Sequence, residues 1–306
     1  MTIQVFGHKA PDTDSTGSPI IWAWYLNEVQ NVPAEAKLLG EPNTEAAFVL
    51  KRWGLEKPAL LEDVGAGDRV VIVDTNNPDE LPAHVNEAEI VEIIDHHKLT
   101  GGLMTAAPIN VTVRAVACTA TILHDLMGEA AARMPEPIKG AMLSCILSDT
   151  LEFRSPTTTD ADKALAEHLA SDLGIAIPDY AAELFAAKSD VSAFSDAELI
   201  RMDSKIGEFG PLKMRISVLE TTAPEMPLGR KASLMETMKT VCAEDGVDEV
   251  MMFVVDILRE EATLLVPNDR VKAIAEKSFG RDVSGDTVVL PGVMSRKKQI
   301  IPNLKV

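Results

Sequence analysis

The chain has 306 residues, a formal net charge of −18 at pH 7 and 46% hydrophobic residues. Its length favours two domains, its composition excludes a disordered chain, and no apolar run reaches the roughly 20 residues that span a bilayer. A surface this acidic repels nucleic acid and anionic membranes, so an anionic ligand requires a local cluster of cations or bound metal ions.

The first half of the chain alternates between strand and helix patterns. The β-branched runs 69–74 and 90–95 each end in an aspartate and are typical of strands covered on both faces of a parallel sheet. In chain order we expect a strand at 3–6, a helix at 19–29, strands at 69–74 and 90–95, and helices at 119–127, 138–147, 160–173 and 178–187. This alternation predicts a doubly wound α/β domain, whose ligands gather beyond the carboxyl ends of its strands.

The pattern changes after the polar segment 188–195 (KSDVSAFS), which suits a hinge. The second half is expected to hold strands at 214–220, 249–257, 262–266 and 287–290, with helices at 231–243 and 269–279. These elements predict a smaller α+β domain. We therefore expect a metal-binding catalytic domain at 1–187, a linker at 188–195 and a second, substrate-binding domain at 196–306.

Four polar motifs lie where the elements of the first half end. The first is the loop 7–15 (GHKAPDTDS), which Pro11 stiffens. The others are Asp74 in VIVDTNN, Asp95-His96-His97 in IIDHHK and Asp149 in LSDT. Each has an ordinary interpretation when taken alone: a helix cap, a turn at a strand end, two adjacent histidines by chance, or an aspartate facing solvent.

Taken together, the four motifs predict a metal site. The candidate ligands are His8, Asp12, Asp14, Asp74, His96 and Asp149. Carboxylates and imidazoles suit Mn, Co, Fe or Zn, whereas Mg usually prefers an all-oxygen shell. Six ligands are too many for one ion with open positions, but they suit two ions that share a bridging carboxylate. Two ions about 3.5–4 Å apart activate a bridging water and neutralise an in-line phosphoryl transfer.

A basic cluster lies near the C-terminus, in the segment SRKKQ. Arg296, Lys297 and Lys298 are conspicuous in so acidic a chain, although an isolated run of this kind is more often a solvated turn. Arginine offers phosphate a bidentate fork and lysine a point charge, and Lys205 could add another cation. The remaining histidines, His84, His124 and His168, have no partner motif and are interpreted as structural or surface residues.

The motifs GHKAPDTDS, VIVDTNN, IIDHHK, LSDT, DSK and SRKKQ occur in the order and spacing found in the family II inorganic pyrophosphatases. The chain therefore resembles this family of the DHH phosphoesterase superfamily along nearly its whole length. The resemblance implies an enzyme that hydrolyses pyrophosphate to two phosphates by attack of a water or hydroxide that bridges two metals. It also implies an active site in the cleft between two domains that close over the substrate.

The resemblance also implies a role for each site residue. His8, Asp12 and Asp149 match the ligands of one metal, Asp14 and His96 those of the other, and Asp74 the carboxylate that bridges both. His97 matches a histidine that contacts substrate and acts as an acid, and Asp95 a residue that orients a ligand imidazole. Lys205, Arg296 and Lys297 match cations that bind pyrophosphate. The expected cofactors are two Mn²⁺ or Co²⁺ per subunit, with Mg²⁺ taken up during turnover, and the expected assembly is a homodimer.

One departure from the family's common pattern concerns the segment after Asp74. Many members carry a histidine directly after the bridging aspartate, whereas this chain has Thr75 followed by Asn76 and Asn77. This difference affects the surroundings of the ligand and the metal preference, but not the ligand set. No segment is inserted before Asp74, so the nucleotide-sensing module of some relatives is not expected.

Two alternative functions remain open at this stage. One is another DHH phosphoesterase, such as an exopolyphosphatase or a single-strand or oligonucleotide exonuclease. The acidic composition and the aromatic content of 4% argue against it, because a nucleic-acid strand needs a basic track and stacking aromatics. The other is a non-catalytic phosphate- or metal-binding regulator, which would be expected to lack a ligand, and all six are present.

Neither the N-terminus nor the cysteines indicate export. The first residues, MTIQVFGHKAPD, lack the basic start and apolar stretch of a signal peptide. Cys118, Cys145 and Cys242 form an odd set without metal-ligand spacing, each in an apolar or helical context. These features favour reduced thiols in a cytoplasmic protein that binds neither nucleic acid nor a membrane.

Overall fold

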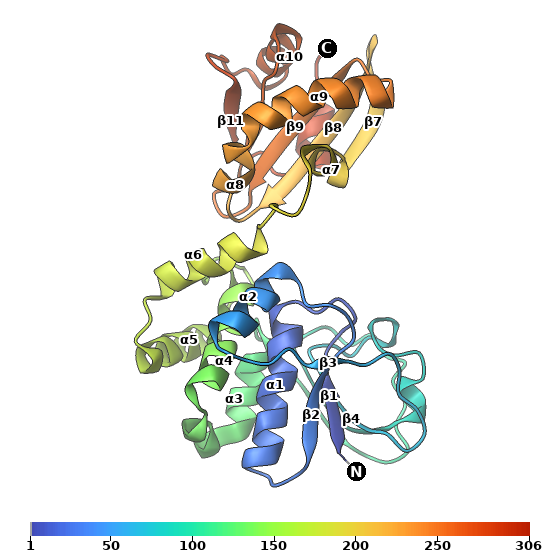
Figure 1. The fold of residues 1–306 in the computed structure, drawn as a ribbon, viewed down its shortest axis with the longest axis vertical. Helices are drawn as coiled ribbons and strands as arrows, with labels where there is room; N and C mark the ends of the chain where they lie inside the picture. The colour runs from blue at the N-terminus through green and yellow to red at the C-terminus, as the bar shows by residue number, and fades with distance from the viewer. Residues whose placement is uncertain (1) are drawn as a thin grey trace. The chain divides into compact units, whose positions relative to one another are not determined.

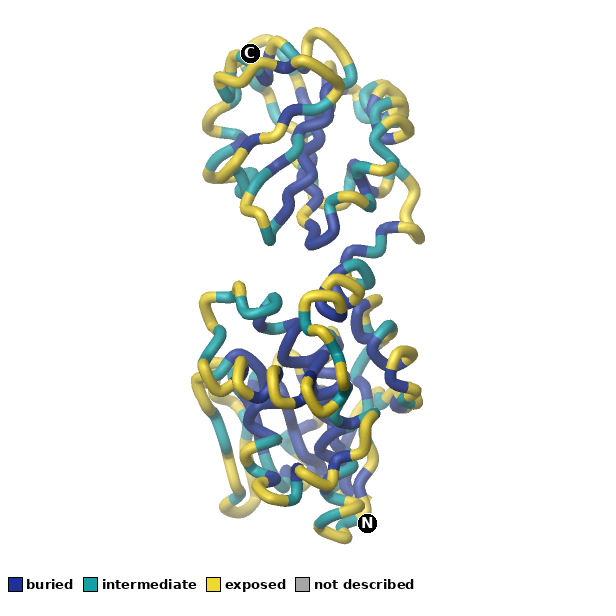
Figure 2. The backbone as a smooth tube through the Cα atoms, turned by 90° about the vertical axis from the view of Figure 1, so that its left-hand side faces the viewer, coloured by how far each residue is buried: buried dark blue, intermediate teal, exposed yellow. Residues whose placement is uncertain are grey.

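The structure is a computed structural model that describes residues 2–306. The chain divides into two compact units, one ending at Lys188 and the other spanning Ser189–Val306 (Figure 1). Each unit has buried strands at its centre and an exposed surface (Figure 2). No helix within residues 2–306 is both long and apolar enough to cross a membrane.

The first unit is built on a parallel sheet of six strands in the order β3-β2-β1-β4-β5-β6. These strands are β1 (Ile3–Phe6), β2 (Ala34–Leu38), β3 (Ala59–Leu60), β4 (Arg69–Val73), β5 (Glu89–Asp95) and β6 (Asn110–Val113). The chain builds one half of the sheet outward from β1 and then returns to add β4 on its other side. The carboxyl ends of β1 and β4 therefore meet where the strand order reverses, which is where open α/β sheets bind ligands.

One face of this sheet is covered by α-helices. They are α1 (Thr13–Glu28), α2 (Thr44–Arg52), α3 (Thr119–Met127), α4 (Glu136–Thr150), α5 (Asp160–Leu173) and α6 (Ile177–Lys188). Val5, Val71 and Ile94 point from the strands into this core and contact side chains of α1, α3 and α4. A 3₁₀ segment, η3 (Gly128–Arg133), joins α3 to α4.

The opposite face is covered by irregular chain instead of helices. Phe6, Val70 and Ile72 pack there against Leu81 and Val85, which belong to the connection that carries the 3₁₀ turns η1 (Pro78–Glu80) and η2 (Val85–Glu87). Connections thus lie on both faces, as expected for strands that are buried on each side. The predicted parallel-sheet α/β domain is confirmed, with helices packed on one face only.

The second unit holds a mixed sheet in the order β11-β10-β9-β8-β7. Its elements are α7 (Asp196–Met202), β7 (Ser204–Phe209), β8 (Leu212–Thr221), α8 (Glu225–Gly229), α9 (Lys231–Asp245), β9 (Glu249–Asp256), β10 (Glu261–Leu265), α10 (Asp269–Phe279), β11 (Thr287–Pro291), η4 (Arg296–Ile300) and α11 (Ile301–Asn303). Only β8 and β9 run parallel. The central β9 is buried along its whole length, between a core that includes α10 and a core that includes α7 and α9. The predicted smaller α+β unit is confirmed.

Several element boundaries differ from the sequence prediction. The helix expected at 19–29 begins at Thr13, because Asp12 caps it and Pro19 is accommodated within it. The helix expected to end at Leu147 continues to Thr150, so Asp149 lies in its last turn. The strand β2 was not predicted, since its sequence AEAKL is short and has no β-branched or aromatic residue.

Candidate metal centre

The loop after β1 brings three predicted ligands to the carboxyl end of the sheet. Asp12 is the N-cap of α1 and accepts a hydrogen bond from Ser15 N at 3.0 Å, so the ordinary capping interpretation holds as well. Ser15 Oγ in turn accepts a hydrogen bond from His8 N at 2.7 Å. A Cβ at Gly7 would lie 2.1 Å from Ser15 Oγ, so only glycine lets the loop fold this tightly.

Asp74 lies at the centre of the cluster and is 1% exposed. Its two carboxylate oxygens face different imidazoles: Oδ2 is 3.6 Å from His8 Nε2, and Oδ1 is 3.3 Å from His96 Nε2. Its backbone has φ 60°, an uncommon value for a residue other than glycine, and its N–H donates to Ile94 O at 2.9 Å. A carboxylate that presents one oxygen to each of two histidines suits a bridge between two cations.

Three groups of side chains place their ligand atoms within 4.8 Å of one another. They are His8 with Asp12 and Asp74, Asp14 with His96 and Asp149, and Asp74 with His96 and His97. The structure thus brings all six predicted ligands together from four separate segments. Asp74 belongs to two of the groups, as does His96, so the groups form one continuous cluster.

Within residues 2–306, the carboxylates of this cluster have ion pairs only with histidines and none with a lysine or arginine. The pKa of Asp74 is raised well above its usual range by burial and then by the neighbouring charges, chiefly Asp14. Burial, followed by Asp14 and Asp12, likewise raises the pKa of Asp149. Asp149 Oδ2 is buried and has no hydrogen-bond partner within residues 2–306. Divalent cations would relieve this repulsion and supply the missing partner, so the residues present fit a metal centre.

The imidazole of His96 is oriented for a cation. Its Nδ1 lies 3.2 Å from Val116 O, which can accept a hydrogen bond only from a protonated Nδ1. That tautomer leaves Nε2 free as a ligand atom on the side of Asp74. A backbone carbonyl therefore selects the ligand nitrogen of this histidine.

His97 is held differently, although it also lies near Asp74. Its Nδ1 is 2.9 Å from Asp95 Oδ1 and 3.9 Å from Asp74 Oδ1, and about half of its side chain is exposed. The hydrogen bond to Asp95, partly opposed by burial, raises the pKa of His97. Because Asp95 occupies Nδ1, that nitrogen is not available to a cation, and Nε2 remains available to another ligand.

Two groups that the sequence interpretation missed support these residues. Asn76 Nδ2 donates to Asp95 Oδ2 at 2.5 Å, and its Oδ1 accepts from Thr100 N at 2.9 Å, so it holds together the segments after β4 and β5. Burial tends to raise the pKa of Asp95, but hydrogen bonds from His97 and Asn76 lower it overall.

Thr119 donates its N–H to Asp14 Oδ2 at 2.7 Å and its hydroxyl to Asp74 Oδ1 at 3.1 Å. The polar Asn-Asn pair after Asp74 was a usable signal; Thr119, at the start of a helix, offered none.

The predicted phosphate-binding cations all lie in the second unit. Arg296 Nη1 donates to Asp203 Oδ1 at 2.7 Å, which ties the segment SRKKQ to the segment DSK that carries Lys205. Gln299 shapes this turn by accepting hydrogen bonds from Met294 N and Ser295 N, both at 2.9 Å. Arg296 Nε is buried with no acceptor in the described part of the chain, whereas Lys205 and Lys297 are exposed.

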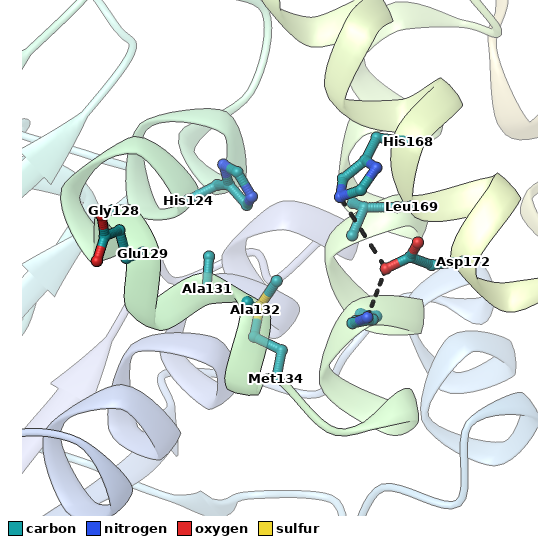
Figure 3. Close-up of a pocket in the computed structure, with 10 residues that line it drawn as sticks. His124, Gly128, Glu129, Ala131, Ala132, Met134, His168, Leu169 and Asp172 are labelled. Atoms are coloured by element: carbon teal, nitrogen blue, oxygen red, sulfur yellow. Dashed lines mark hydrogen bonds and ion pairs between the residues drawn. The ribbon is translucent and has the colours of Figure 1, made fainter.

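Two of the remaining histidines line a separate pocket of about 210 Å³ (Figure 3). His168 Nε2 lies 4.0 Å from Asp172 Oδ2, which also accepts a 2.5 Å hydrogen bond from Lys139. Burial and the charge of His168 lower the pKa of His124. The pocket contains none of the six predicted ligands. The third histidine, His84, forms an ion pair with Asp63 at the surface.

The chain is similar to known proteins along nearly its whole length. Residues 2–149 match the model of the DHH family, N-terminal domain, and residues 182–306 match that of the DHHA2 domain. The chain is 41% identical to a probable manganese-dependent inorganic pyrophosphatase of Deinococcus radiodurans, over 99% of this chain and 98% of the relative. It is 36% identical to the manganese-dependent inorganic pyrophosphatase of Methanocaldococcus jannaschii, over 98% and 97% of the two chains.

A solved structure is similar along the same length. It is the crystal structure of a putative family II inorganic pyrophosphatase from Methanococcus jannaschii, with a TM-score of 0.62 and 34% sequence identity. The match covers 99% of this chain and 98% of that one. The similarity therefore includes both units and the segments that carry the six candidate ligands.

Proposed function

The chain belongs to the family of manganese-dependent inorganic pyrophosphatases, and from this premise we propose how its residues carry out that reaction. It is an inorganic pyrophosphatase, a hydrolase of a phosphoanhydride. The observation that carries the proposal is the position of Asp74, whose two oxygens face His8 and His96. One carboxylate can thus serve two cations.

We assign two divalent cations to the six clustered side chains. His8 and Asp12 would serve one ion and Asp14 and His96 the other, with Asp74 serving both. Asp149, expected beside His8 and Asp12, lies instead in the group of Asp14 and His96 and would serve their ion. The mixture of imidazole and carboxylate favours Mn²⁺ or Co²⁺ for tight binding over Mg²⁺, which prefers oxygen ligands and is assigned to the substrate complex. When bound, the ions supply positive charge to the phosphate oxygens and activate water for attack on phosphorus.

The chain's own side chains complete the proposed mechanism. His97 would contact the phosphate and give a proton to the leaving group through Nε2, because Asp95 holds Nδ1 and stabilises the protonated ring. Lys205, Arg296 and Lys297 would bind the phosphate oxygens, with the unpaired Nε of Arg296 as one donor. Asp95 acts through His97 and has no contact of its own with the substrate.

The experiment that tests this function is phosphate release from substrates of increasing length. Full-length protein loaded with Mn²⁺ would be assayed with pyrophosphate, tripolyphosphate, ATP and a dinucleotide. We expect kcat/KM for pyrophosphate to exceed the others by at least about a hundredfold, or roughly 2.7 kcal/mol, because a short and densely charged anion matches a small set of cations. Comparable rates on a dinucleotide or a long polyphosphate would assign the chain to another phosphoesterase activity.

A further inference from the structure

A buried carboxylate that is not among the predicted ligands lies behind the metal cluster. Glu45, in the first turn of α2, is 0% exposed. Its Oε1 accepts a hydrogen bond from Thr13 Oγ1 at 2.9 Å. Its Oε2 lies 3.1 Å from Lys188 Nζ as an ion pair that lacks the direction of a hydrogen bond. Burial of the Glu45 carboxylate is costly, and the cation beside it, Lys188, keeps 37% of its side chain exposed, which directs attention to what the two residues connect.

The pair connects two segments that carry metal ligands. Thr13 stands between Asp12 and Asp14 at the start of α1. On the other side, Lys188 Nζ donates a long hydrogen bond of 3.5 Å to Ser148 Oγ, and Ser148 directly precedes Asp149. The contacts therefore run from Thr13 through Glu45 and Lys188 to Ser148; we call these four residues the brace.

These two segments are the ones that like charges push apart. Asp14 and Asp149 place carboxylate oxygens within 4.8 Å of each other in the group they form with His96. Two carboxylates at this distance repel when no cation lies between them. The brace opposes that repulsion, since it joins the first turn of α1, which holds Asp14, to the end of α4, which holds Asp149, through an ammonium group. A third contact, from Asn43 N to Pro11 O at 3.0 Å, fixes the start of α2 to the loop that leads into α1.

We propose that Lys188 is a positioning residue that, with Glu45, holds the ligand-bearing segments at the spacing required for metal binding. This inference rests on the proposed function, because it assigns the metal centre to the six clustered residues. Lys188 acts through Glu45 and Ser148 and contacts no predicted ligand directly. Its place at the end of α6 also makes it the last residue of the first unit, so the brace lies where that unit ends.

The direction in which the affinity for Mn²⁺ changes when Lys188 is replaced separates this proposal from an effect of charge alone. Removing a cation close to a metal site raises the affinity for a divalent cation when charge alone matters. The proposal predicts the reverse, because loss of Lys188 leaves Glu45 unpaired and frees the two segments to separate. The substitution Lys188→Met keeps the length of the side chain and removes the charge.

The test is a titration of metal-free full-length protein with Mn²⁺. Binding is measured by calorimetry and, independently, by the electron paramagnetic resonance signal of free Mn²⁺. We expect Lys188→Met to weaken binding about tenfold, the scale at which residues behind metal ligands act. Thr13→Val removes only the hydroxyl that links Glu45 to the loop, without a change of charge, and should weaken binding in the same direction. Lys57→Met, which breaks the exposed ion pair between Lys57 and Glu41, is the matched control and should bind as wild type.

The outcomes distinguish the brace from the metal centre itself. Unchanged or tighter Mn²⁺ binding in Lys188→Met, or unchanged binding in Thr13→Val, overturns the brace. Wild-type protein that binds no Mn²⁺ overturns the proposed function instead. Circular dichroism of each metal-free variant shows whether it folds, and Thr13→Val keeps the proposal testable if Lys188→Met does not.

Discussion

Replacing Asp149 by asparagine should stabilise the metal-free protein and weaken its stabilisation by metal. In the absence of cations the Asp149 carboxylate destabilises the folded state, because its Oδ2 is buried without a hydrogen-bond partner in the described residues and Asp14 lies nearby. An amide of the same shape removes one of the two charges and can donate a hydrogen bond to Asp14. The same change removes a predicted ligand.

The structure sets the scale of this effect. Two unit charges 4.8 Å apart, the limit of separation in this group, repel by about 3.5 kcal/mol at an effective dielectric constant of about 20. Because the carboxylates can share a proton, the expected gain in the free energy of unfolding for Asp149→Asn without metal is smaller, about 1–3 kcal/mol. Binding of Mn²⁺ stabilises the wild-type protein. At a free Mn²⁺ concentration of a hundred times Kd, it adds about 2.7 kcal/mol per site to the free energy of unfolding.

Thermal and urea unfolding followed by tryptophan fluorescence can measure both effects. All three tryptophans, Trp22, Trp24 and Trp53, lie in the first unit, so the signal reports on the unit that holds the cluster. We expect the variant to be the more stable protein in chelator and wild type to be the more stable in Mn²⁺. Glu167→Gln, an exposed change on α5, should alter neither. A variant that is less stable in chelator, or that keeps the full response to Mn²⁺, would refute the reasoning.

Three further predictions concern other parts of the chain. Gly140→Ala should lower the free energy of unfolding by about 2–3 kcal/mol in urea, because its Cβ would lie 2.1–2.3 Å from ring atoms of Trp53, whereas Gly65→Ala, with open space around it, should not. Burial raises the pKa of Glu92 above 4.5, so the folded state holds its proton more tightly and stability is lost as pH rises from about 4.5 through the folded pKa. Glu92→Gln keeps an acceptor for Trp22 Nε1, so its free energy of unfolding should match that of wild type at pH 4 and exceed it at pH 7; an equal difference at both pH values would contradict this. Lys297→Ala should raise KM for pyrophosphate at least about tenfold while the bound Mn²⁺ per chain stays at the wild-type value, and a loss of metal would show that Lys297 acts elsewhere.

The sequence predicted the fold where a residue pattern has a single structural consequence. The runs 69–74 and 90–95 are apolar on both faces, and both became central parallel strands with aspartates at or just past their ends. Polar and short elements escaped prediction: β2 has five residues and is partly exposed, and the first turn of α1 is made of small polar residues whose helical state depends on the Asp12 cap.

The candidate site shows the same division between local and tertiary information. His8, Asp74 and His96 could be proposed because each lies at the end of a predicted element, and parallel strands bring such ends together. The contacts of Thr119, Asn76 and Glu45 could not, because each depends on a partner 19 or more residues away along the chain. A threonine or asparagine carries no sign of its tertiary partner, so the network behind the ligands required the structure.

The most direct test of the metal centre is the number of Mn²⁺ ions bound per chain in wild type and in Asp74→Asn. Native mass spectrometry of both proteins at saturating Mn²⁺ gives this number without reference to activity. Because a neutral amide bridges two cations poorly, we expect two ions in wild type and fewer than two in the variant, together with loss of phosphate release from pyrophosphate. Two ions and full activity in Asp74→Asn would contradict the central role assigned to this carboxylate.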